Sequence, residues 1–293
     1  MLLKSLKARS EEMYKNDDML SQMESYTIER RGTAIHYWIT QRDYTKPLVI
    51  FTHGASLDHR MFDMQVKVLQ NAGYPILTWD VRGHGLSKPV GEEFHVQIVV
   101  EDLEEIIYKH QIEEVILVGH SFGGYVSQML TFHQSEKVKA IAIIGCTDIT
   151  EVPSFGMRIA YRNMSRIFRM MPESTLRKKF AEGMGVTKDV QNYALNTNKQ
   201  LTRDEFIEIM DGGVRAIYED PHFGNEYTIE KPFLLTHGEK DSAERGAFVK
   251  KAPNWAKREL NCQYEVIPNA GHNANQDNPD YFNDVLLHFL ERL

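Results

Sequence analysis

Short apolar runs alternate along most of this chain with longer segments in which apolar residues recur at helical spacing. The runs have the length of buried strands; they are residues 47–52, 74–79, 115–118, 138–144, 233–238 and 264–267. The segments between and after them have an apolar stripe every three to four positions, which is typical of helices packed on a sheet; they include residues 60–71, 94–110, 125–130 and 279–292. This alternation predicts an α/β protein with a mostly parallel sheet covered on both faces.

The segment before the first buried strand has a different pattern. Residues 26–30 and 34–40 alternate apolar and polar positions around Arg31-Gly32, which predicts a hairpin at the edge of the sheet. Residues 1–24 are mostly polar and form an N-terminal extension. Two interpretations stay open for it: a helix that docks on the body or on a second subunit of a homodimer, and a partly frayed terminus.

One long segment, residues 151–226, interrupts the alternation with helical patterns and no convincing strand. One helix is predicted by the apolar stripe Met157, Tyr161, Met164, Phe168 and Met171, and residues 201–217 predict another. An all-helical insert at this place predicts a lid over the carboxyl edge of the sheet, where open α/β folds bind ligands. The predicted division is a core of residues 25–150 and 227–293 with a lid of residues 151–226.

Four arginines accompany this stripe, at positions 158, 162, 166 and 169. They are interpreted as a solvated face, with contact to an acidic substrate or an acyl carrier as the alternative.

The composition argues against several classes of protein. The 293 residues are 42% hydrophobic and 26% charged, as in ordinary globular domains, and the net charge of -7 argues against a nucleic-acid partner. Two cysteines, Cys146 and Cys262, are too few for a disulfide framework, which favours a reducing, cytoplasmic setting. The sequence predicts no signal peptide and no membrane span. The histidines lack metal-ligand spacing and no phosphate-cradling glycine loop is found, so neither metal nor cofactor is expected.

The strongest chemical motif is Gly119-His120-Ser121-Phe122-Gly123-Gly124, which follows a buried strand and precedes a helix. A Gly-x-Ser-x-Gly sequence in that setting predicts a nucleophile elbow, a sharp turn that holds the serine hydroxyl above the sheet edge. A serine hydroxyl needs a base within hydrogen-bond reach, and the base needs an acid that orients it.

Candidates for the base and the acid follow two later strands. His272 comes after the strand ending at Ile267, and Asp241 comes after the strand ending at Gly238. Both therefore belong to the same sheet edge as Ser121, in the Ser, Asp, His order expected with an elbow. Asp148, just past another strand, is the main rival for the acid, and Glu239 is a weaker one.

These motifs resemble those of the α/β-hydrolase superfamily, in particular its bacterial branch of esterases, carbon–carbon bond hydrolases and cofactor-free haloperoxidase-like proteins. The motifs are His53-Gly54, residues 80–87 (DVRGHGLS), residues 119–124 (GHSFGG), residues 238–241 (GEKD) and Gly271-His272. They span most of the chain after residue 30. The resemblance implies a mostly parallel sheet of about eight strands, with helices on both faces and a helical lid insertion.

The resemblance also implies roles for single residues. Ser121 would be the nucleophile, His272 the base and Asp241 the orienting acid. The backbone amides of Ala55 and Phe122 would form the oxyanion hole, where each preorganised donor can contribute a few kcal/mol.

Five polar residues near these motifs are expected to be structural. His53 would bond backbone beside the oxyanion loop, and His120 would point away from Ser121. Asp80, Arg82 and His84 would brace the loop that follows their strand through hydrogen bonds.

The sequence departs from the family at two places. Ala55 replaces the glycine common in carbon–carbon hydrolases, which favours ordinary esters, and Ser242 and Ala243 follow the acid where a proline is often found.

The predicted function is a carboxylesterase-like serine hydrolase that acts on a small or medium apolar ester through an acyl-enzyme. The alternatives are a carbon–carbon bond, lactone or thioester hydrolase with the same triad, and a non-catalytic hydrolase-like receptor.

Overall fold

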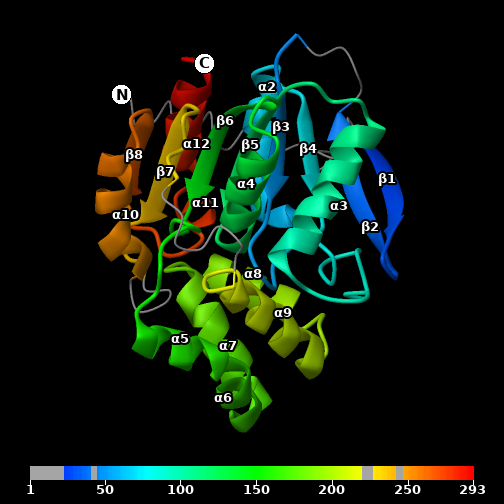
Figure 1. The fold of residues 1–293 in the computed structure, drawn as a ribbon, viewed down its shortest axis with the longest axis vertical. Coiled ribbons are helices and arrows are strands. Elements are labelled where there is room, and N and C mark those ends of the chain that lie inside the picture. The colour runs from blue at the N-terminus through cyan, green and yellow to red at the C-terminus, as the bar shows by residue number, and fades with distance from the viewer. Residues whose placement is uncertain (1–22, 41–44, 220–226, 242–246) are drawn as a thin grey trace.

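The central sheet has eight strands within residues 23–40, 45–219, 227–241 and 247–293, the part of the chain that this computed structural model describes (Figure 1). They are β1 (Met23–Arg30), β2 (Thr33–Thr40), β3 (Leu48–Thr52), β4 (Ile76–Trp79), β5 (Val115–His120), β6 (Val138–Ile144), β7 (Phe233–Gly238) and β8 (Cys262–Ile267). Their order is β1-β2-β4-β3-β5-β6-β7-β8. β1 and β2 form the predicted antiparallel hairpin at one edge, and β3 to β8 are parallel.

Helices cover both faces of this sheet because successive strand residues point to opposite sides. In β3, Leu48 and Ile50 join the apolar core beneath α3 (Val96–Lys109), α4 (Phe122–His133) and α10 (Ala247–Arg258). Val49 and Phe51 join the second core, beneath α2 (Asp63–Asn71) and α12 (Pro279–Leu290). The central strands β3 and β5 to β7 are buried on both faces almost throughout, which explains why their sequences are nearly continuous apolar runs. The predicted mostly parallel sheet of about eight strands with helices on both faces is confirmed.

The segment between β6 and β7 is helical in the residues described. Its helices are α5 (Phe155–Arg162), α6 (Met164–Met170), α7 (Glu173–Met184), α8 (Lys188–Asn198) and α9 (Arg203–Arg215). Figure 1 shows them beyond the arrowheads of β6 and β7, at the carboxyl end of the parallel strands. A capping box formed by Thr202 and Glu205 begins α9, which buries Phe206 and Ile209 as predicted.

The prediction of one helix through the 157–171 stripe is wrong. The chain leaves helical geometry at Asn163 (φ -104°, ψ 4°), which ends α5 and precedes α6. The Asn163 side-chain amide donates to the Ile159 carbonyl at 2.8 Å, so it competes with the backbone for a helical acceptor. The stripe still packs inward, with Tyr161 buried and Phe168 partly buried. The four arginines are consequently divided between two helices, and Arg169 pairs with Asp204 on the surface.

Two short helices flank the functional loops. A 3-10 helix, η2 (His59–Phe62), follows β3, and α11 (Ala274–Asp277) follows β8. The proposed N-terminal extension falls almost entirely outside the described residues, and Met23 and Glu24 already belong to β1.

Candidate active site

Ser121 sits at the turn between β5 and α4 with φ 49° and ψ -116°. A non-glycine residue in this region is strained, and such strain is typical of functional turns. The flanking glycines allow the turn, because a Cβ on Gly119 would lie 2.2 Å from the Gly123 carbonyl oxygen. A Cβ on Gly123 would lie 2.1 Å from the Thr52 carbonyl oxygen. The motif therefore folds as the elbow that its sequence predicts.

His272 and Asp241 meet above the carboxyl ends of β7 and β8. His272 Nδ1 donates to Asp241 Oδ2 at 3.0 Å, and both residues are buried. The two rival acids bond elsewhere. Asp148 pairs with Arg258 at 2.6 Å, and Glu239 accepts from the Asn269 amide at 2.9 Å. The geometry thus brings Asp241, and neither rival, to the imidazole.

A cavity of about 250 Å³ joins the serine and the histidine. Ser121 and His272 both line it, together with Gly54, Ala55, Met184 and Met210. Phe122 is the first residue of α4, so its amide is one of those that a helix leaves without an intrahelical partner. Ala55 and Phe122 lie close together, since a Cβ on Gly213 would be 3.6 Å from Ala55 Cβ and 3.9 Å from Phe122 Cδ2.

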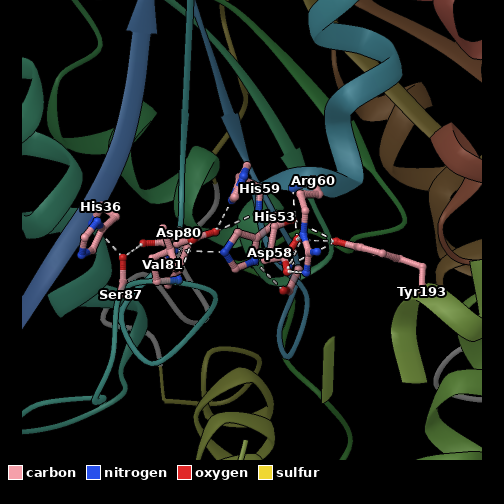
Figure 2. A network of polar contacts seen from close by, with 11 residues as sticks. His36, His53, Asp58, His59, Arg60, Asp80, Val81, Ser87 and Tyr193 are labelled. Carbon is pink, nitrogen blue, oxygen red and sulfur yellow. Dashed lines mark hydrogen bonds and ion pairs between the residues drawn. The ribbon is translucent and has the colours of Figure 1, made fainter. Parts of the chain in front are cut away.

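The loop that carries Ala55 is held by buried polar residues around Asp80 (Figure 2). His53 Nε2 accepts from the Val81 amide at 3.0 Å, and His84 Nε2 accepts from the Ser56 amide at 2.8 Å. Asp80 Oδ1 accepts from both the amide and Nδ1 of His59, at 3.0 and 2.8 Å. These contacts confirm that His53, Asp80 and His84 brace the loops, as predicted.

Arg82 extends the same bracing away from the cavity. Its guanidinium donates to both carboxylate oxygens of Asp102, at 2.7 and 2.9 Å, and to the Val90 carbonyl oxygen at 3.1 Å. Arg82 and Asp102 are fully buried, so the charge of Arg82 depends on Asp102, which also accepts from Arg30 Nε at 3.3 Å. Asp102 lies on α3, and no sequence motif identifies it as the partner of Arg82.

Tyr193 on α8 connects the inserted helices to the loop after β3 (Figure 2). Its hydroxyl donates to Asp58 Oδ1 at 2.9 Å. Burial raises the pKa of Tyr193 well above its ordinary value, so it is a neutral donor at physiological pH. Asp58 also accepts from Arg60, which balances its charge. The sequence analysis missed this contact, because Tyr193 is one of many tyrosines and no local pattern connects it to Asp58.

His120, predicted to be structural and to point away from Ser121, makes its polar contact with the backbone of His272. Its Nε2 lies 3.1 Å from the His272 carbonyl oxygen, the two rings are 4.8 Å apart, and His120 lines the cavity. Nε2–H therefore donates to the backbone of the residue proposed as base. Burial lowers the pKa of His120 well below its ordinary value, which keeps the imidazole neutral. Its role is support for the His272 loop.

The buried histidines predict a loss of stability in mild acid. Burial lowers the pKa of His53, His84 and His120, that of His84 to about 3. Below about pH 6.5 the unfolded chain binds protons that these folded imidazoles do not, so unfolding becomes more favourable by up to about 1.4 kcal/mol per pH unit for each.

Opposing groups reduce this loss without reversing it. Burial raises the pKa of Asp63 to about 6, and burial also raises that of Glu208, so both carboxyls favour folding as pH falls. Burial alone would lower the pKa of His59, but the hydrogen bond and charge of Asp80 outweigh burial and raise this pKa. The stability that His59 contributes is therefore present in acid and is lost as pH rises. Urea unfolding at pH 7 and pH 5 should show lower stability at pH 5. A higher stability there would contradict this assignment.

Neither a membrane span nor a metal site is found in the part of the chain described. No helix in it is long and apolar enough to cross a bilayer, and no cluster of three or more His, Cys, Asp or Glu side chains could hold a metal ion.

The fold and the elbow define this protein as an α/β-hydrolase. The family model described as serine aminopeptidase, S33, matches residues 43–278, so the chain belongs to this family. It is 26% identical over 256 residues to the AB hydrolase superfamily protein YisY of Bacillus subtilis, covering 82% of this chain and 90% of that protein. It is 24% identical over 276 residues to the sn-1-specific diacylglycerol lipase ABHD11 of Mus musculus, covering 89% and 86%.

A solved structure has the same fold. The esterase from Exiguobacterium antarcticum superposes with a TM-score of 0.75 over 92% of this chain and all of that chain, at 19% identity. Together with the family match, the esterases and lipases among the relatives show that the protein is a hydrolytic enzyme.

Proposed function

We propose that the protein is a serine hydrolase that cleaves a small or medium apolar carboxylic ester. The observation that carries the proposal is the 3.0 Å hydrogen bond between His272 Nδ1 and Asp241, beside a cavity that His272 shares with Ser121. Because Nδ1 carries the proton in this bond, Nε2 is the basic nitrogen.

The proposed mechanism has two steps. Ser121 Oγ attacks the ester carbonyl carbon while His272 Nε2 takes its proton, and the amides of Ala55 and Phe122 stabilise the oxyanion. The carbon–oxygen bond of the ester breaks, and His272 gives its proton to the departing alcohol. Water, deprotonated by His272, then attacks the acyl carbon, and the carboxylic acid leaves as Ser121 regains its proton.

The cavity walls support the proposed substrate class. Phe180 and Met184 come from α7 and Met210 from α9, so the inserted helices supply the apolar surface that would contact an acyl group. The volume of about 250 Å³ lies just below the roughly 300–1,000 Å³ of pockets for drug-sized ligands, which favours a small substrate. We propose that these helices act as a lid. Cys146 and Cys262 are free thiols, which supports a cytoplasmic setting.

A fluorophosphonate probe tests this function without knowledge of the natural substrate. We expect the probe to modify Ser121 covalently, because an activated serine beside an oxyanion hole attacks phosphorus as it attacks a carbonyl. The matched control is Ser127→Ala, since Ser127 is a buried serine on α4 whose hydroxyl bonds the Gly123 carbonyl at 2.9 Å. This variant should still be labelled. Folded wild-type protein that resists the probe would instead indicate a hydrolase-like receptor.

A further inference from the structure

One lysine, Lys179, lines the same cavity as Ser121 and His272. Among the described residues that line it, there is no other lysine or arginine and no aspartate or glutamate. We propose that the substrate carries a carboxylate that binds Lys179 while its ester group lies at Ser121. This inference rests on the proposed function, because it assigns a substrate class to that site.

The charges on α7 leave Lys179 without an acidic partner from its own helix. The helix contains Glu173 and Glu182 as its acids and residues 177–179 as its bases. Glu173 pairs with Arg177 at 2.7 Å, and Glu182 pairs with Lys178 at 3.8 Å. No ion pair involving Lys179 occurs among the residues that the structure describes. An anion in the cavity would therefore meet a cation that no carboxylate of the described residues neutralises.

Room for such an anion exists one helical turn further along. Gly183 lies four residues after Lys179, on the same face of α7, and it also lines the cavity. A Cβ added to Gly183 would meet no atom within 4 Å, so this position borders open space. The missing side chain leaves a gap beside the lysine that a substituent of the substrate can occupy.

The position of Lys179 also keeps the cost of an ion pair low. Lys179 is an exposed residue, whereas His272 is buried, so the lysine lies where the cavity meets solvent. An ammonium at such a mouth keeps water on one side, and the pair avoids the full desolvation of a buried one. The apolar chain of the substrate would lie between its carboxylate and its ester, against Phe180 and Met184.

Matched esters test this assignment. Monomethyl adipate and methyl hexanoate differ only in a terminal carboxylate on the acyl side, and O-butanoylglycolate and ethyl butanoate differ in the same way on the alcohol side. For at least one pair, we expect Lys179→Met to lower kcat/KM of the anionic ester about tenfold, mainly through KM, and to leave the neutral ester unchanged. Lys179→Arg should restore most of the loss, and the pair affected identifies the side that carries the carboxylate.

The adjacent lysine supplies the control. Lys178→Met removes the same charge from the same helix, but Lys178 pairs with Glu182 and does not line the cavity. This substitution should leave kcat/KM unchanged for both pairs of esters. Equal effects of the two substitutions, or none from Lys179→Met, would overturn the proposal. Calorimetry on Ser121→Ala, with and without Lys179→Met, measures binding of the same esters in the absence of turnover. Ester turnover that does not depend on Ser121 would refute the proposed function, whereas a preference for the carboxylate esters that Lys179→Met leaves unchanged would refute this inference alone.

Discussion

Ser121→Ala is expected to lower kcat for a p-nitrophenyl ester by about 10³- to 10⁶-fold, the range seen when a hydrolase loses its nucleophile. The substitution removes the hydroxyl of Ser121, which lines the cavity together with His272. His272, Asp241 and the amides proposed as the oxyanion hole stay in place, so any residual turnover would come from water in the same site. Initial rates measured against an enzyme-free blank give the ratio.

The same variant should fold normally. Alanine keeps the Cβ of serine, so the strain at φ 49° is unchanged and the free energy of unfolding should stay within about 1 kcal/mol. Full esterase activity in a folded Ser121→Ala protein would exclude Ser121 as the nucleophile.

Asp241→Asn is expected to lower kcat by about 10⁴-fold. The carboxylate accepts the Nδ1 proton of His272 at 3.0 Å and thereby keeps Nε2 basic. An asparagine can offer an N–H at this place, which favours the opposite tautomer and leaves Nε2 protonated. It also lacks the charge that stabilises the imidazolium formed during attack. The rate should fall with little change in KM, because Asp241 lies behind the histidine.

Asp148→Asn is the matched control, since Asp148 also follows a strand end and was the main rival for the acid. It pairs with Arg258 rather than with His272, so kcat should stay near the wild-type value. Because Arg258 is 40% exposed, the lost ion pair should cost about 1 kcal/mol or less in stability. A large rate loss in Asp148→Asn, with Asp241→Asn near wild type, would reverse the assignment.

Local sequence patterns predicted the strands and the elbow correctly. The continuous apolar runs became β3 and β5 to β7 because a strand buried on both faces has no polar side. The need for Gly119 is also local, since its Cβ would meet Gly123 and Ser127, whereas a Cβ on Gly123 would meet Thr52 on the neighbouring strand β3. The break at Asn163 escaped prediction because helical spacing continues through it, and that spacing does not reveal the bond from the Asn163 side chain to the Ile159 carbonyl.

The sequence by itself determined the order of elements, the turn at Ser121 and the sheet edge to which the acid and the base belong. All three follow from residues close together in the chain, where steric limits and apolar periodicity act directly. Only the tertiary structure decided between Asp241 and Asp148 as the partner of His272, paired Tyr193 with Asp58, and put Lys179 on the cavity wall. Those choices depend on how helices and loops distant in sequence pack, and packing fixes distances that no local pattern contains.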